Sequence, residues 1–291
     1  MSGFLRGTGV ALATPFNKDG SIDFDGVTSL VNYCIDGGIE YLVVLGTTAE
    51  SVTLSKEEKK TLVQHVVKVN NKRLPVVIGI GGNNTAAILE ELEQIDTSEF
   101  DAILSVVPMY NKPTQEGMYH HYKVINDTSP LPILLYNVPS RTGSNMTAET
   151  TLRLSKLDNI IGIKEAVGDF TQVLRIIKDK PDDFLVISGD DTLALPAVAA
   201  GGDGVISVIG QGFPKEFSEM IRLGLSGHIQ QAFNALYGLL PVIDYAFEEG
   251  NPAGIKSILK TKGVCDDNVR LPLLPATQDL AKKIKVFIEN Y

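Results

Sequence analysis

The chain has 291 residues, which fits one large α/β barrel of about 250 residues with an appendage. Its composition, 44% hydrophobic and 21% charged without low-complexity tracts, excludes a disordered chain. The formal net charge of −9 argues against nucleic acid as a partner, because phosphate binding needs a clustered basic surface. A small anionic substrate stays compatible with this charge, since a single arginine in a cleft can bind it.

The two cysteines and the apolar segments indicate the cellular compartment in which the protein works. Cys34 and Cys265 lie far apart without metal-ligand spacing, so we expect no zinc site. A disulfide between them is one alternative, but two thiols in so long a chain suit a reducing compartment better. The N-terminal segment does not read as a signal peptide, and no apolar segment reaches the roughly 18 residues of a membrane span. We therefore expect a cytoplasmic protein without a membrane span.

Short apolar runs recur at nearly regular intervals. Most are near-continuous rather than alternating, which is typical of strands buried on both faces of a parallel sheet. Segments with apolar residues at helical spacing lie between them, and Ser55 with Glu58 forms a capping box before one such segment. The predicted strands are Val10–Ala13, Tyr41–Leu45, Val76–Ile80, Ala102–Val107, Ile133–Tyr136, Ile160–Lys164, Phe184–Ser188 and Val205–Val208.

This alternation of strands and helices predicts an α/β protein with a closed (β/α)8 TIM barrel. An open doubly wound sheet is the alternative. Pro214–Leu225 is the expected last barrel helix, and no strand is predicted after it. We predict a catalytic barrel over residues 1–227 and a C-terminal helical extension over residues 228–291, with helices Ile229–Ala246, Pro252–Lys260 and Thr277–Asn290.

The working side chains of such barrels follow the carboxyl ends of the strands. Lys164 closes the sixth predicted strand. Burial disfavours the charged form of a lysine and so favours the neutral amine that attacks a carbonyl. Tyr136 ends the preceding strand and can exchange protons beside that amine. The alternatives are a lysine that reaches solvent or pairs with Glu165, and a tyrosine that caps the core.

Three loops at the same end carry further candidates. Thr47 and Thr48 follow the second strand after a glycine, in a turn suited to binding a carboxylate. Arg141 follows the fifth strand and can clamp a carboxylate in bidentate fashion. Tyr110 lies between two prolines after the fourth strand. The alternatives are ordinary turn chemistry for the threonines, a surface position for Arg141 and simple packing for Tyr110.

Other signals do not indicate a cofactor or metal. The glycine-rich stretch GIGGNN fits no nucleotide-binding pattern. Asp190 and Asp191 precede Leu193–Ala200 and are better explained as a helix N-cap than as a metal site. His120 and His121 are adjacent, point in different directions and make a poor chelate.

Several motifs together resemble one family. GTTAES at 46–51, YNVPSRTG at 136–143 and IGIKEA at 161–166 resemble the pyruvate-dependent class I aldolase family, which includes N-acetylneuraminate lyase, and most closely its dihydrodipicolinate synthase branch. The similarity covers nearly the whole chain, through MYNKPTQEG, SGDD, GGDGVISV and VRLPLLP. It implies that Lys164 forms a Schiff base with pyruvate, whose enamine adds to L-aspartate 4-semialdehyde in lysine (diaminopimelate) biosynthesis. Because the cationic iminium is itself the electron sink, no cofactor or metal is needed.

The resemblance also assigns roles to the catalytic candidates. It implies that Tyr136, Thr47 and Tyr110 form a proton relay. Tyr110 would be inserted from a neighbouring subunit, in a homotetramer built from tight dimers.

The same resemblance implies how the substrates are bound. Thr47 and Thr48 would hold the carboxylate of pyruvate, and Arg141 that of the semialdehyde. Gly189 and the backbone carbonyl of Ile206 would lie near the substrates.

Two other functions compete with this one. A lyase that cleaves N-acetylneuraminate or a keto-deoxy sugar acid would use the same enamine, but it needs hydroxyl-binding groups where Arg141 stands. A catalytically silent barrel that binds keto acids need not keep Lys164, Tyr136 and Thr47. Ala49, Met109 and the segment NPAG at 251–254 depart from the family pattern, which concerns loop shape and regulation rather than the reaction.

Feedback by lysine is expected to be weak or absent. In lysine-sensitive relatives the effector lies at the dimer interface, and the matching positions here are Ser51, Val52, Lys56, Lys59, Asn83, Ala87 and Met109. Two lysines would face a cationic ligand there, and Ala87 replaces a carboxylate. Glu90 or Glu91, one turn further along, can partly compensate.

Overall fold

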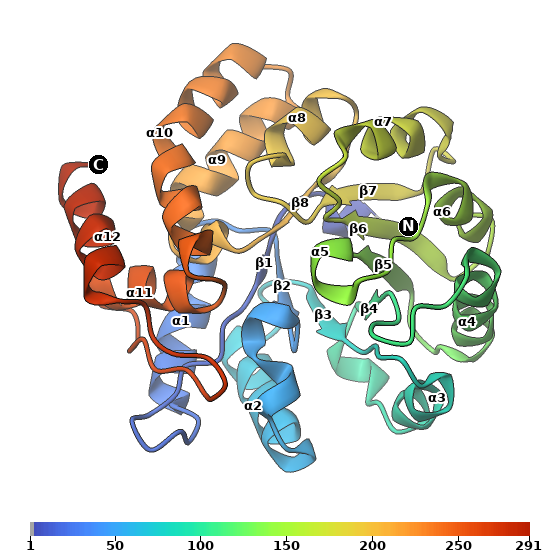
Figure 1. Cartoon of the computed structure of the whole chain (residues 1–291), viewed down its shortest axis with the longest axis horizontal. Helices are drawn as coiled ribbons and strands as arrows, with labels where there is room; N and C mark the ends of the chain where they lie inside the picture. Colours follow the sequence, from blue (N-terminus) through green and yellow to red (C-terminus); the bar gives the residue numbers. More distant parts are fainter. Residues whose placement is uncertain (1–2) are drawn as a thin grey trace.

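The computed structural model describes residues 3–291 and contains a closed barrel of parallel strands in the order β1 to β8 (Figure 1). Each strand pairs with the next, and β8 pairs with β1. The predicted TIM barrel is therefore confirmed, and the open sheet is excluded. The strands are β1 Gly7–Ala11, β2 Tyr41–Val44, β3 Val76–Gly79, β4 Ala102–Val106, β5 Ile133–Asn137, β6 Ile160–Glu165, β7 Leu185–Ser188 and β8 Gly204–Ser207.

The predicted strands coincide with these, with small differences at the ends. The largest difference is in β1, which begins at Gly7 instead of Val10. Its first residues, Gly7 and Thr8, pair with Gly204 and Val205 of β8. This pairing joins the first strand to the last and so closes the barrel. No local apolar run predicts it.

Helices cover the outside of the barrel. The capping box is confirmed, because Ser55 Oγ accepts from Glu58 N at 3.2 Å and the Glu58 carboxylate accepts from Ser55 N at 2.8 Å. Cys34 is fully buried in α1, and both cysteines are free thiols. The helices are α1 Phe24–Asp36, α2 Lys56–Asn70, α3 Thr85–Glu93, α4 Gln115–Thr128, α5 Pro139–Thr142, α6 Ala148–Leu154, α7 Phe170–Asp179, α8 Ala194–Ala199 and α9 Pro214–Leu225.

The start of α8 differs from the prediction. Asp190 accepts the N–H groups of Thr192 and Leu193 in the turn before the helix, but the helix itself has no side-chain cap. Asp191 does not cap it either.

Asp191 instead supports the loop after β8. Its buried carboxylate accepts the hydroxyl of Ser207 and the N–H groups of Val208 and Ile209. These buried amides would otherwise lack a partner, which is unfavourable. The N-cap prediction for Asp191 is therefore wrong, because it used sequence neighbours and the partners lie across the fold.

The interior of the barrel is packed with side chains. Tyr41 is fully buried there, and its hydroxyl donates to the carbonyl of Val205 at 3.3 Å. A Cβ at Gly9 would lie 2.1 Å from the Tyr41 ring, so only glycine leaves room for it. A larger apolar cluster lies between the strands and the surrounding helices. The barrel is thus a solid core rather than a pore.

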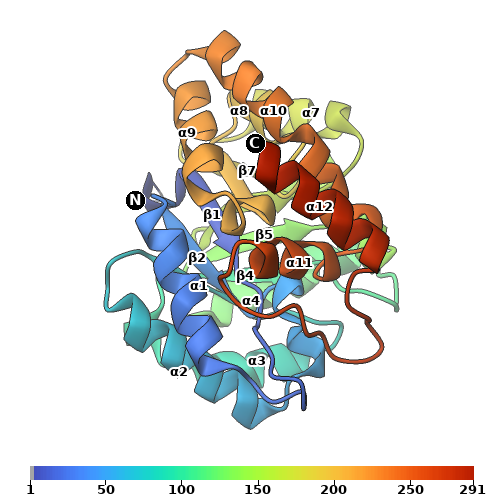
Figure 2. The same cartoon turned by 90° about the vertical axis from the view of Figure 1, so that its left-hand side faces the viewer.

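The C-terminal segment adds α10 Ile229–Glu248, α11 Ala253–Thr261 and α12 Gln278–Asn290. In Figures 1 and 2 these helices, coloured orange to red, gather on one side of the barrel next to α9. Leu236, Ile258 and Ile284 belong to the same apolar cluster as the barrel helices. The boundary between residues 227 and 228 stays a prediction. Among the helices described, none combines the length and apolar character of a membrane span.

Candidate active site

A cavity of about 570 Å³ opens at the carboxyl ends of the strands. This volume suits a small-molecule ligand. Two predicted site residues, Tyr110 and Ile206, do not line it. Those that do are Thr47, Thr48, Tyr136, Arg141, Lys164 and Gly189.

Lys164 and Tyr136 face each other across neighbouring strands. They are directly paired in the register of β5 and β6, and Lys164 Nζ lies 4.3 Å from the centroid of the Tyr136 ring. Lys164 is only 5% exposed and forms no ion pair or hydrogen bond within residues 3–291. Its neighbour Glu165 lies on the opposite face of β6 and does not pair with it. The site therefore holds a buried amine beside a phenol, which is the arrangement of a nucleophile with a proton-transfer partner.

The threonine turn follows β2. Thr48 is buried, and its hydroxyl accepts from Asn251 Nδ2 at 2.9 Å. Thr14 Oγ1 donates to the carbonyl of Ala49 at 2.7 Å. Asn251 lies between α10 and α11, so the extension contributes directly to this wall of the cavity.

A buried ion pair holds the same turn from behind. Lys256 Nζ lies 2.6 Å from Glu50 Oε1, and both side chains are almost fully buried. The other carboxylate oxygen of Glu50 accepts from Arg270 N at 2.9 Å. Burial lowers the pKa of Lys256, while Glu50 acts in the opposite direction. Sequence reasoning missed this pair, because no local pattern links α11 to the loop after β2.

Arg141 and Tyr110 sit on neighbouring loops. Arg141 is exposed at the cavity in α5, and its Nη2 donates to the carbonyl of Asn251 at 3.5 Å. Tyr110 N donates to the carbonyl of Thr142 at 3.3 Å, but the Tyr110 side chain is 88% exposed. Tyr110 and Lys112 both have positive φ, at 69° and 45°. The tyrosine is thus held away from the cavity of its own chain.

Carboxylates form the remaining charged wall of the cavity. Glu248 of α10 pairs with Lys283 of α12 at 2.6 Å. Asp190 is engaged by backbone amides, as described above. Asp244 of α10 lines the cavity without a partner within residues 3–291. Asp244 and Glu248 were not predicted, because they lie on a helix whose sequence shows only the periodicity of a packed element.

The structure contains no cluster of three or more His, Cys, Asp or Glu side chains suited to a metal ion within residues 3–291. His120 is exposed near Glu116, whereas His121 is buried and bonded to Thr85. The two histidines thus point in different directions, as predicted.

A TIM barrel with a buried lysine beside a tyrosine at the carboxyl ends of the strands has the arrangement expected of a class I aldolase type of lyase. The comparisons place the chain within that class. The model of the dihydrodipicolinate synthetase family matches residues 4–291. The 4-hydroxy-tetrahydrodipicolinate synthase of Flavobacterium psychrophilum is 56% identical over 291 residues, covering 100% of this chain and 99% of that protein. The chain belongs to the dihydrodipicolinate synthetase family.

Solved structures agree with this family. A chloride-inhibited dihydrodipicolinate synthase from Acinetobacter baumannii, in complex with pyruvate, has a TM-score of 0.94 and 36% identity, covering 98% of each chain. A monomeric variant of a dihydrodipicolinate synthase has a TM-score of 0.95 and 37% identity, covering 98% of this chain and 96% of that one. The predicted family, fold and enzyme class are confirmed.

Proposed function

We propose that the chain condenses pyruvate with L-aspartate 4-semialdehyde, as a 4-hydroxy-tetrahydrodipicolinate synthase of lysine biosynthesis. The observation that carries this proposal is the buried, unpaired amine of Lys164 beside the Tyr136 ring at the base of a small-molecule cavity. The names of the relatives support the choice of substrates.

The reaction begins with attack of the neutral Lys164 amine on the ketone of pyruvate. The carbinolamine loses water and gives an iminium cation, and loss of a proton from the methyl group gives the enamine. The enamine carbon then forms a bond to the aldehyde carbon of the semialdehyde. The amino group of that substrate attacks the iminium carbon, closes the ring and releases Lys164, so that one water leaves per turnover.

Each of these steps moves protons, and hydroxyl groups are placed to carry them. Tyr136 lines the same cavity with its ring centroid 4.3 Å from Lys164 Nζ, and we assign to its hydroxyl the protons of carbinolamine formation and dehydration. Thr47 lines the same cavity and is exposed. We assign the third member of the relay to Tyr110 of a second copy of the chain.

The outward position of Tyr110 supports this assignment. Non-glycine residues with positive φ are uncommon and strained, yet this loop has two, and they present a phenol to the outside. A tyrosine needed only for packing would be turned inward. Tight dimers that assemble into a tetramer would bring Tyr110 into a neighbouring cavity, and we expect them to act in the cytoplasm.

The two substrate carboxylates require separate partners. Thr48 has a fixed hydroxyl and, with Thr47, would bind the carboxylate of pyruvate. Arg141 is exposed at the cavity and offers a bidentate fork to the carboxylate of the semialdehyde. Gly189 borders the same space, and Ile206 would contribute its backbone carbonyl.

Turnover assays test this proposal directly. We expect condensation with pyruvate and L-aspartate 4-semialdehyde and no cleavage of N-acetylneuraminate. Cleavage of the sugar acid without condensation would assign the chain to the competing lyase activity. Binding of pyruvate without either reaction would indicate the silent barrel.

A further inference from the structure

The strands that carry Lys164 and Tyr136 also carry a buried polar pair on their outer faces. The register pairs Asn137 with Glu165, one residue beyond Tyr136 and Lys164. Because successive side chains point to opposite faces of a strand, the first pair faces the cavity and the second faces the helices outside the barrel. Asn137 is fully buried and Glu165 is 3% exposed.

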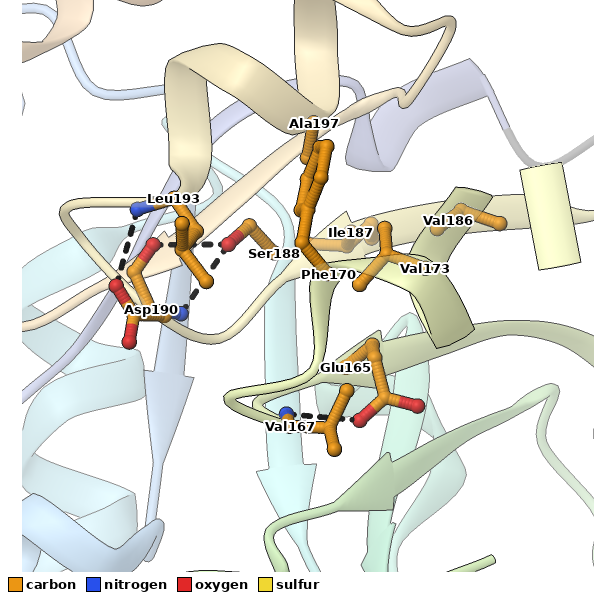
Figure 3. Close-up of a pocket in the computed structure, with 10 residues that line it drawn as sticks. All are labelled: Glu165, Val167, Phe170, Val173, Val186, Ile187, Ser188, Asp190, Leu193 and Ala197. Carbon is orange, nitrogen blue, oxygen red and sulfur yellow. Dashed lines mark hydrogen bonds between the residues drawn. The ribbon is translucent and has the colours of Figure 1, made fainter. Parts of the chain in front are cut away.

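The carboxylate of Glu165 accepts hydrogen bonds from three groups. Asn137 Nδ2 donates to its two oxygens at 2.9 and 3.1 Å, and Gln172 Nε2 donates at 3.0 Å. The N–H of Val167 donates at 3.0 Å, a bond visible in Figure 3. We call Asn137, Glu165 and Gln172 the outer clamp.

The outer clamp also fixes the segment that follows Arg141. Asn137 Oδ1 accepts from Met146 N at 3.0 Å, and Gln172 Nε2 donates to the carbonyl of Met146 at 3.0 Å. On the other side, the carbonyl of Glu165 accepts from Gly189 N at 2.7 Å. The side chains of the clamp therefore connect the strands that carry Tyr136 and Lys164 with Met146, and the backbone of Glu165 links β6 to Gly189.

The pairing of β5 and β6 is irregular near its start, so the alignment of the two strands beyond this point has to be fixed by other contacts, such as those of the clamp. Ile133 pairs with Ile160, but Leu134 pairs with Gly162, so the register shifts by one residue. With this shift Lys164 lies opposite Tyr136 in the cavity. A further slip of one residue would turn the side chains that follow to the other face and move Lys164 away from the cavity. The clamp lies at the cavity end of both strands, beyond the shift.

The burial of a carboxylate at this position is unfavourable in itself. Desolvation raises the pKa of Glu165 to about 7, although the bonds from Asn137, Gln172 and Val167 oppose the shift. A well-packed apolar pair would avoid this penalty. The polar pair differs from an apolar one in that it specifies a single alignment of the two strands.

We propose that Glu165 is a positioning residue, which acts through Asn137 and Gln172 to fix the register that holds Lys164 against Tyr136. This inference rests on the proposed function, because the aligned residues are those of the proposed reaction. Glu165 itself does not line the substrate cavity.

A swap of the two clamp residues tests this proposal. Asn137→Asp places two carboxylates against each other and breaks the link between the strands, whereas Glu165→Gln keeps one oxygen that can accept from Asn137 Nδ2 and weakens the link. The double variant restores one carboxylate opposite one amide. We expect Asn137→Asp to lower kcat on the order of a hundredfold, since small misplacements of reacting groups have effects of that size, with a smaller change in KM, and Glu165→Gln to lower kcat less. The double variant should recover at least about a tenth of the wild-type kcat by the same reasoning.

A matched control separates positioning from stability. Asn159 lies at the opposite end of the same strand pair, where its Nδ2 donates to the carbonyls of Ser129 and Leu131 at 3.0 Å. Asn159→Ala should lower Tm without lowering kcat. Glu165→Asp keeps the charge but shortens its reach, and offers a milder variant should the single variants not fold.

The rate at which borohydride traps pyruvate on Lys164 is the second readout. We expect slower trapping in the single variants and recovery in the swap. Multiplicative losses in the double variant would overturn the proposal, as would a loss of kcat in Asn159→Ala that matches the loss in the single variants at an equal decrease in Tm. Failure of the proposed function is distinguishable, because it would show as a wild-type chain that neither traps pyruvate nor turns over the semialdehyde.

Discussion

The loops after β2 and β4 lie at the same end of the barrel, yet they place their polar side chains differently. The loop after β2 is anchored inside the chain by Asn251, by the Glu50–Lys256 ion pair and by Arg270. The loop after β4 is held by bonds of Met109, Tyr110 and Asn111 to Asn83 and Thr142, but it projects the Tyr110 side chain to the outside. Each loop contains two non-glycine residues with positive φ. The loops therefore differ in where their polar side chains lie rather than in strain, and the projecting tyrosine is the one that we propose to act in a second copy of the chain.

The largest effect on stability is expected from breaking the ion pair that holds the loop after β2. Lys256→Met leaves Glu50 buried without its partner, so the free energy of unfolding should fall by about 3–5 kcal/mol. Lys283→Met, which breaks the exposed pair with Glu248, should change it far less, because solvent screens an exposed ion pair. Chemical denaturation measures both. Equal effects would show that burial does not distinguish the two pairs.

The projecting loop is tested by complementation between subunits. Tyr110→Phe should lower kcat on the order of a hundredfold by interrupting proton transfer, while leaving the stability of the chain unchanged. Arg141→Ala should still form the pyruvate adduct but lose use of the semialdehyde. Mixed dimers of the two variants should regain activity at a site with both residues intact. If proven subunit exchange restores nothing, Tyr110 does not act across an interface.

A decrease in pH should destabilise the side of the barrel that carries the projecting loop. His121 of α4 is bonded to Thr85 of α3 at 2.8 Å, and burial lowers its pKa from 6.5 to about 4. Between these pH values the unfolded state binds the proton more readily, so stability falls as the pH decreases through this window. Glu165 acts with the opposite sign, because its pKa is raised to about 7 and its contribution is lost as the pH rises toward that value.

The pH effect of His121 can be isolated with one variant. The difference in Tm between the wild type and His121→Gln should change between pH 7 and pH 4. A difference that does not depend on pH would show that His121 does not titrate in this range.

The smallest effect is expected on the initial rate when free L-lysine is added. Lys56 and Lys59 act electrostatically on Glu91, and Asn83 Nδ2 already donates to the carbonyl of Met109 at 3.2 Å. A cationic effector would therefore find like charge and occupied polar groups. Initial rates should be insensitive to submillimolar L-lysine at low and at saturating pyruvate. Clear inhibition in that range would show that an acidic partner for the ligand remains.

The sequence was sufficient for the parts that depend on local pattern. Apolar runs predicted every strand, and polar residues at or just after their ends predicted five of the 18 residues that line the cavity, including Lys164 and Tyr136. The closing pair of β1 with β8 and the partners of Asp191 could not be predicted, because both depend on residues far apart in the chain. The outer clamp was missed for the same reason, although Glu165 directly follows Lys164.

The central claim is that Lys164 is the nucleophile because it is buried and unpaired. Lys256 is the matched comparison, since it is buried even more deeply but is engaged by Glu50. Treatment with pyruvate and borohydride, followed by peptide mass mapping, should find the adduct on Lys164 and leave Lys256 unmodified. An adduct on another lysine with Lys164 unmodified, or no pyruvate-dependent adduct at all, would contradict the account.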